Sequence, residues 1–227
     1  RLAHEMNGTW YPWAASKNTN TAEDYVAAWK HLRRVFDDAG ADKGGWVWSP
    51  NVDVANAGFT GMAALYPDDE FVDWIGLDGY NWGDAGGQRW QTFSQVFGAS
   101  LAAIPNLGPK SASKPIMIAE TASGSDGGSK AAWMRSAFFS EIPFDFPEIR
   151  AVVWFDENKE RPWRFDTNSE TTKAFRDAAN RTNYAARLSA ADIVTATGAR
   201  RSTDPGDDRD RTRDRPRQRR NRRDKRG

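Results

Sequence analysis

Two glutamates stand in surroundings that suit acid–base and nucleophilic chemistry. Glu5 follows His4 in the opening stretch RLAHEMNGTWYPW, and Glu120 ends the apolar run PIMIAE. A carboxyl group that keeps its proton can donate it to a leaving oxygen, while an ionised one can attack a carbon or stabilise a positive charge. Two such groups that converge from different parts of the chain are the pair that cleaves a glycosidic bond.

Aromatic side chains surround both glutamates in the sequence. The 227 residues include 11 Trp and 12 Phe but only 5 Tyr. Tryptophan has a large flat ring that fills a core or stacks on the C–H face of a sugar. Trp10 follows Glu5, Tyr80 and Trp82 end the run GLDGYNW, and Trp154 lies in AVVWFDENKE. Sugar hydroxyls would also need polar partners, for which His4 and Asn7 are candidates. The pattern favours a carbohydrate site.

A parallel α/β arrangement would bring these residues together. Short apolar runs predict strands, and stretches with apolar residues at steps of three and four predict helices. Alternating strands and helices indicate βα units, in which the carboxyl ends of the strands form one face. The predicted strands are 45–49, 71–80, 115–120 and 149–155, with 2–5 as the end of another; the predicted helices are 21–39, 88–104, 129–140 and 170–181, with a short one at 59–65. A doubly wound open sheet fits the same pattern, but no glycine-rich nucleotide loop supports a nucleotide-binding version.

Composition excludes several other classes of protein. The sequence has no cysteine and two histidines, which argues against a disulfide framework, a thiolate nucleophile and a His-rich metal site. It has no apolar run long enough to predict a membrane span. We therefore predict no metal, no cofactor and no membrane contact.

The charge is distributed unevenly between a body and a tail. Residues 199–227 contain 12 Arg, 1 Lys and 6 Asp, giving +7, so residues 1–198 carry −6 of the net +1. The tail has no aliphatic or aromatic side chain after Ala199, and we predict residues 191–227 to be disordered. A basic run can bind nucleic acid, but the interleaved aspartates and the lack of aromatic residues favour a solvated tail. The predicted folded domain is 1–190.

Four motifs in order resemble glycoside hydrolase family 26, a clan A family of (β/α)₈ TIM barrels. They are LAHEMNGTWYPW, GLDGYNW, KPIMIAETAS and VVWFDENKERPWRFD, and the resemblance covers about residues 2–181. The resemblance implies that Glu5 is the acid/base after strand four and Glu120 the nucleophile after strand seven. It also implies that Tyr80 orients the nucleophile. The implied substrate-binding residues are His4, Trp10, Trp82, Trp154 beneath the reactive sugar and Trp163 on the cleft rim.

The same resemblance implies a retaining mechanism, which in such enzymes uses carboxyl groups about 5–5.5 Å apart. The substrate expected first is β-1,4-mannan, cleaved by an endo-acting, secreted, monomeric enzyme whose signal peptide would lie upstream. Mixed-linkage β-1,3-1,4-glucan and β-1,3-xylan are alternative substrates within the family. A non-catalytic polysaccharide-binding protein, and more weakly a nucleic-acid-binding protein with a basic tail, are alternatives of another class.

The chain departs from the family pattern because segments matching barrel strands one to three are missing. We therefore expect an incomplete barrel that holds strands four to eight. Half a barrel exposes a strand edge on each side and folds poorly on its own. We accordingly expect no activity from these residues alone.

Overall fold

The computed structural model describes residues 1–41, 43–53, 58–181 and 184. The predicted tail, 191–227, and the last residues of the predicted domain lie outside this part of the chain. Four parallel strands form one sheet in the order β1-β2-β3-β4. They are β1 (Val47–Trp48), β2 (Trp74–Asn81), β3 (Ile116–Ser123) and β4 (Ile149–Trp154). The predicted parallel α/β arrangement is thus confirmed for these strands.

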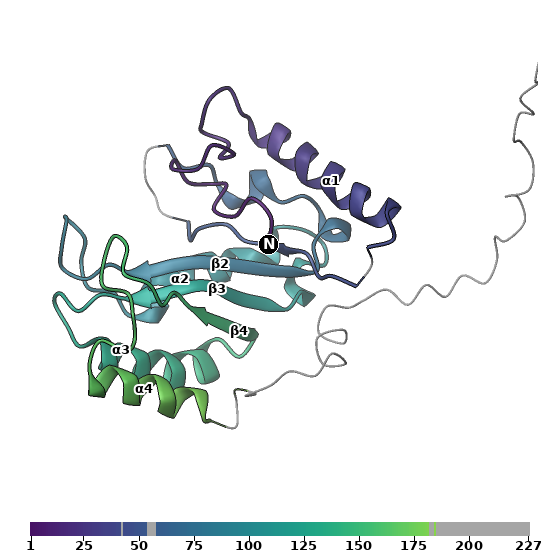
Figure 1. The fold of residues 1–227 in the computed structure, drawn as a ribbon. Helices are drawn as coiled ribbons and strands as arrows, with labels where there is room; N and C mark the ends of the chain where they lie inside the picture. Colours follow the sequence, from purple (N-terminus) through teal and green to yellow (C-terminus); the bar gives the residue numbers. More distant parts are fainter. Residues whose placement is uncertain (42, 54–57, 182–183, 185–227) are drawn as a thin grey trace, which may run out of the picture.

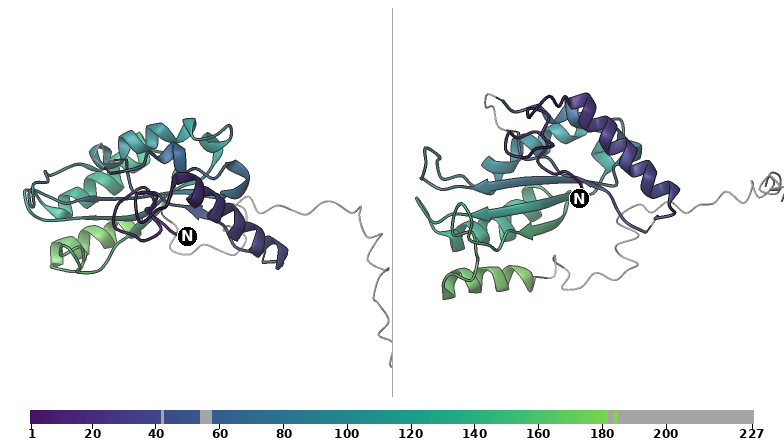
Figure 2. Two further views of the ribbon diagram at one scale, coloured as in Figure 1. Left: turned by 90° about the horizontal axis from the view of Figure 1, so that it is seen from above. Right: turned by 45° about the horizontal axis from the view of Figure 1, so that its top comes forward.

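Helices connect and cover the strands (Figure 1). In that view α1 lies above the sheet, α2 behind it, and α3 and α4 below it. A second pair of views shows the strands running side by side with the helices around them (Figure 2). The elements are α1 (Ala22–Asp38), α2 (Phe93–Ala103), α3 (Lys130–Ser136) and α4 (Ser169–Ala179), the 3₁₀ turns η1 (Met62–Leu65), η2 (Asp69–Phe71), η3 (Ile104–Asn106) and η4 (Ser111–Ser113), and the π-helical η5 (Ala137–Asp145). None of the helices in the described residues is long and apolar enough to cross a membrane.

Side-chain caps set where the helices begin. Thr21 caps α1 and Thr92 caps α2, each in a reciprocal capping box with the residue three positions later. Helix α2 starts five residues later than the predicted 88, because backbone amides just before it donate hydrogen bonds to side chains outside the helix. The amide of Gln91 donates to the Asn81 side chain, and that of Trp90 donates to Asp84.

The predicted strand at residues 2–5 is wrong. Ala3 and Glu5 have φ angles of 41° and 53°, in the left-handed region that no strand uses. One backbone hydrogen bond still ties this segment to the sheet, from the Glu5 amide to the Ser49 carbonyl at 2.7 Å. The segment is an irregular loop at the β1 edge of the sheet.

A β-bulge in β3 decides which way Glu120 points. Leu77 of β2 pairs with Ile118, but the next residue, Asp78, pairs with Glu120, so Ala119 is an extra residue. Side chains alternate between faces along a regular strand, which would put Glu120 on the same face as Ile118. The bulge moves Glu120 to the face of Asp78 instead.

The two faces of the sheet therefore have different roles: one packs against helices and the other carries polar side chains. One face packs against the helices: Gly79 lies so close to Phe97 of α2 that a Cβ there would sit 2.9 Å from its ring. Ile75, Leu77 and Ile118 complete that buried layer. The other face carries Asp78, Tyr80 and Glu120, and it positions the candidate site.

Candidate active site

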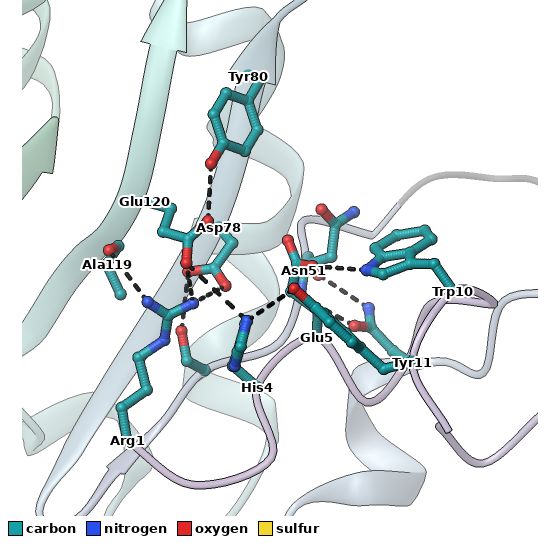
Figure 3. Close-up of polar contacts among 12 residues, drawn as sticks. Arg1, His4, Glu5, Trp10, Tyr11, Asn51, Asp78, Tyr80, Ala119 and Glu120 are labelled. Carbon is teal, nitrogen blue, oxygen red and sulfur yellow. Dashed lines mark hydrogen bonds and ion pairs between the residues drawn. The ribbon is translucent and has the colours of Figure 1, made fainter. Parts of the chain in front are cut away.

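Glu120 is held by two donors (Figure 3). The Tyr80 hydroxyl donates to Oε2 at 2.7 Å, and Nη2 of Arg1 donates to Oε1 at 2.5 Å. Burial, followed by the bond to Glu120, raises the pKa of Tyr80, so its phenol keeps the proton that it donates. Together these two groups hold both oxygens of the Glu120 side chain in place. Glu120 has the surroundings that a nucleophile needs.

Glu5 lies in a drier environment. Its side chain is buried, and Oε2 accepts a hydrogen bond from Nε1 of Trp10 at 2.6 Å. Burial raises the pKa of Glu5 to about 7; the negative charge of Glu120 adds to the shift, and the Trp10 hydrogen bond opposes it. A carboxyl group with such a pKa is protonated in about half of the molecules at neutral pH, and it can both donate and accept a proton there. Glu5 therefore has the properties of a general acid.

His4 lies between the two carboxylates in Figure 3. Its Nε2 is 4.0 Å from Oε1 of Glu120 and 3.1 Å from the Tyr11 hydroxyl. Burial and the Arg1 charge lower the pKa of His4, which favours the neutral ring. Trp13 donates to the His4 carbonyl at 2.8 Å and stacks on Tyr11 with 4.4 Å between ring centroids. The opening loop is thus an organised part of the site.

Local backbone features of this loop place Glu5 and Trp10. Glu5 adopts a left-handed φ, a conformation that costs about 1–3 kcal/mol and recurs at functional sites. The Trp10 ring folds back over Gly8, where a Cβ would lie 2.5 Å from it. Asn7 is fully buried and bonds both the amide and the carbonyl of Asn51, at 2.9 and 2.8 Å. Asn7 therefore pins the loop to the segment after β1, although its side chain had seemed suited to sugar hydroxyls.

The predicted aromatic residues reach different places. Trp10 is 46% exposed, and its ring forms one side of the site next to Glu5. Trp82 is half-buried, with its ring 6.2 Å from that of Tyr80. Trp163 is only 1% exposed and packs behind these two, with centroids 4.9 Å from Tyr80 and 5.1 Å from Trp82. In this structure Trp163 supports the site from behind and does not line a cleft rim.

Trp154 does not join the two carboxylates, contrary to the expectation that it lies beneath a bound sugar. It pairs with Thr121, so it points to the face opposite Glu120. Its ring packs against Trp133, Phe138 and Phe175, with centroids 6.0 to 6.5 Å away, in the helical layer. Phe155, the next residue, is on the site face, with its ring 5.9 Å from Tyr80.

Asp78 and Arg1 are central to the site, although neither was among the site residues predicted from the sequence. Asp78 is completely buried; it accepts from Ser49 at 2.9 Å and from Arg1 at 2.5 Å. Burial raises the pKa of Asp78, and the Arg1 guanidinium opposes that shift. Asp78 lies two residues before Tyr80 on one strand, and the two-residue period of a strand is the signal that could have placed both on one face. Arg1 precedes an irregular loop, and no periodicity could place it.

Three side chains have atoms that could bind a cation. Ligand atoms of His4, Glu5 and Asp78 all lie within 4.8 Å of one another. The Arg1 guanidinium already neutralises Asp78, and the Trp10 indole already bonds Glu5. We assign no metal to this cluster.

Because the pKa of Glu5 is raised, the free energy of unfolding should depend on pH. Between about pH 4.5 and 7 the folded Glu5 binds more protons than the unfolded one, so the stability of the wild type falls as pH rises through this window. Glu5→Gln keeps a neutral side chain, and we expect it to become more stable than the wild type by about 1–3 kcal/mol at pH 8 but not at pH 5. Urea denaturation at both pH values measures this. Glu148→Gln, at an exposed glutamate, is the control; a pH-independent difference for Glu5→Gln would contradict the prediction.

The fold and the site together define the class of protein. Glu120 on a parallel sheet and Glu5 on the loop beside it are two carboxyl groups in contrasting surroundings, with aromatic side chains around them, as in glycoside hydrolases. The family model described as glycosyl hydrolase family 26 matches residues 1–123, and the chain belongs to this family. The matched segment includes Glu5, Tyr80 and Glu120.

Individual relatives cover the chain to different extents. Endoglucanase H of Acetivibrio thermocellus is 42% identical over 182 residues, which are 78% of this chain and 19% of that protein. A mannan endo-1,4-beta-mannosidase of Bacillus subtilis is 26% identical over 162 residues, which are 69% of this chain and 38% of that protein. The chain thus spans well under half the length of these curated relatives.

Solved structures have the same fold. The catalytic domain of an endo-beta-1,4-mannanase of this family from Bacillus sp. JAMB-750 superposes with a TM-score of 0.62 at 24% identity, over 88% of this chain and 53% of that one. A double mutant of an endo-beta-1,4-mannanase from Cellulomonas fimi gives 0.59 at 20% identity, over 86% and 42%. The fold is therefore α/β of the (β/α)₈ barrel type.

Proposed function

We propose that this chain is the part of a retaining glycoside hydrolase that carries both catalytic carboxylates. The observation that carries the proposal is the contrast between them. Glu120 accepts hydrogen bonds from Tyr80 and Arg1, whereas Glu5 is buried and has its pKa raised to about 7. One group is therefore ready to attack while the other is ready to donate a proton.

The mechanism that follows is a double displacement. In the first step Glu5 gives its proton to the glycosidic oxygen as the bond to the anomeric carbon breaks, and a Glu120 oxygen bonds to that carbon. In the second step Glu5 takes a proton from water, the water oxygen attacks the same carbon, and the bond to Glu120 breaks. Tyr80 holds the Glu120 carboxylate in one orientation through both steps. Two inversions retain the configuration of the sugar.

The substrate class is a β-linked polysaccharide, with β-1,4-mannan as the first candidate. The printed names of the Bacillus subtilis relative and of both solved structures support mannan. The 42% identity to an endoglucanase supports β-glucan as the second candidate, although the match covers only 19% of that protein. Polysaccharides are too large to enter cells, so we also propose an extracellular location. We further propose that the four described strands correspond to strands five to eight of a barrel, with the loop that carries Glu5 at the place of strand four.

Hydrolysis assays test this proposal. They should use the longest form of the protein that its gene encodes. We expect new reducing ends from mannan, mixed-linkage β-glucan or β-1,3-xylan, and the substrate with the highest kcat/KM identifies the specificity. Proton NMR at early times should show the β-anomer as the first product. Binding of these polysaccharides without hydrolysis would support a non-catalytic binding protein instead.

A further inference from the structure

Three consecutive backbone carbonyl groups of the β4–α4 loop (residues 155–168) accept hydrogen bonds from side chains of other elements. Lys130 Nζ donates to the carbonyls of Pro162 and of Arg164, the latter at 2.9 Å. Nε1 of Trp154 donates to the carbonyl between them, that of Trp163, at 3.0 Å. The two donors come from different elements, α3 and β4. Together they fix the backbone at the residue that they enclose.

Lys130 occupies an unfavourable position for a lysine. It is 2% exposed, and burying an ammonium group is costly unless strong acceptors compensate. It is also the first residue of α3, where the helix dipole disfavours a positive charge. Burial lowers the pKa of Lys130, and the Asp156 carboxylate opposes this shift. The two loop carbonyls are the compensation that this position requires.

The fixed loop residue leads directly to the nucleophile. The Trp163 ring is buried against Tyr80, with 4.9 Å between centroids. The Tyr80 hydroxyl in turn donates to Glu120 at 2.7 Å. A displaced Trp163 would leave a void behind the Tyr80 ring and allow it to tilt away from the carboxylate. Contacts therefore run without a gap from Lys130 to Glu120.

We propose that Lys130 and Trp154 are positioning residues that clamp Trp163, and through it hold the Tyr80 hydroxyl on Glu120. This inference rests on the proposed role of Glu120 as nucleophile. It gives Trp154 a function in the helical layer, where it cannot contact a sugar. It also makes Trp163 a support for Tyr80.

Two variants remove the hydrogen-bond donors of Lys130 and Trp154. Lys130→Met keeps an unbranched side chain without its donors, and Trp154→Phe keeps an aromatic ring without the N–H. Lys173→Met, at an exposed lysine on α4, is the control. In hydrogen exchange we expect the amides of Trp163 and Phe165 to exchange at least tenfold faster in both variants, with unchanged rates in β2 and β3. Unchanged loop exchange would overturn the clamp, and this readout requires no activity.

The link to Tyr80 is tested in two further ways. With 3-fluorotyrosine incorporated, the ¹⁹F resonance that disappears in Tyr80→Phe belongs to Tyr80, and we expect it to shift or broaden in Lys130→Met. In hydrolysis we expect Lys130→Met to lower kcat about tenfold and to change KM less than twofold, because Lys130 touches no substrate.

Combining the variants separates positioning from a general loss of structure. If Lys130 acts through Tyr80, then adding Lys130→Met to Tyr80→Phe should cause no further loss of kcat. An equal tenfold loss in both backgrounds, or a Tyr80 resonance that does not respond, would overturn the proposal. Absence of hydrolysis in the parent protein would count against the proposed function alone, because the exchange and ¹⁹F readouts would still decide the clamp.

Discussion

Glu120→Gln is expected to lower the hydrolysis of the preferred polysaccharide by about 10⁴-fold or more, because the amide cannot form the covalent intermediate. The amide also loses the charge that pairs with Arg1, so a modest change in stability should accompany the effect. Initial rates of reducing-end formation measure the loss. Glu148→Gln controls for the substitution itself, since that glutamate is exposed and remote from the site.

Chemical rescue identifies the role of Glu120 more specifically than the loss of rate. Glu120→Ala leaves space on the side from which the carboxylate attacks. With an activated aryl glycoside, azide can enter that space, bond to the anomeric carbon and expel the aryloxide. The product expected is the α-glycosyl azide, formed by a single inversion. Activity in Glu120→Ala without azide that matches the parent would rule out the assigned mechanism.

Glu5→Gln is expected to affect substrates according to their leaving groups. For the polysaccharide, whose leaving oxygen needs a proton, kcat should fall by about 10²–10⁴-fold. A dinitrophenyl glycoside needs no proton, so its first step should remain fast, and a burst of dinitrophenol should precede slow turnover. The slow phase reflects the missing base that activates water. Equal losses for both substrates, without a burst, would show that Glu5 is not the acid/base.

The pH profile provides a second readout of the same residue. The acid form of Glu5 is needed in the first step, and burial raises the pKa of Glu5 to about 7. Hydrolysis of the polysaccharide by the parent protein should therefore decline as pH rises through about 7. The first step of Glu5→Gln with the dinitrophenyl substrate should lack that decline.

The sequence predicted the parts of the site that depend on position along a strand or just after it. Glu120 and Tyr80 belong to apolar runs, and parallel strands bring such residues to one face. It also predicted four of the strands, because their apolar runs are continuous and bounded by turns. The loop that carries Glu5 was assigned to the right place but to the wrong conformation, because only the tertiary fold imposes a left-handed φ at Glu5.

The errors share a physical origin in sheet register. Trp154 was expected at the sugar because it ends an apolar run, but a strand presents alternate residues to opposite faces. Which face a residue takes depends on pairing with the neighbouring strand, here Thr121, and no local pattern encodes that pairing. No sequence pattern indicated the role of Lys130 either, because its partners are backbone carbonyls more than thirty residues away along the chain.

The bulge at Ala119 makes the orientation of the nucleophile depend on how β3 pairs and not on how many residues it has. Ile118 and Glu120 point to opposite faces, as two adjacent residues of a regular strand would, because Ala119 is the extra residue between them. Deleting Ala119 would therefore leave Glu120 on the face of Asp78. If Ala119 instead paired regularly with β2, the Glu120 carboxylate would turn to the face of Phe97. Every reactive group would still be encoded, in order, and a search for the catalytic glutamates in the sequence would not reveal the loss.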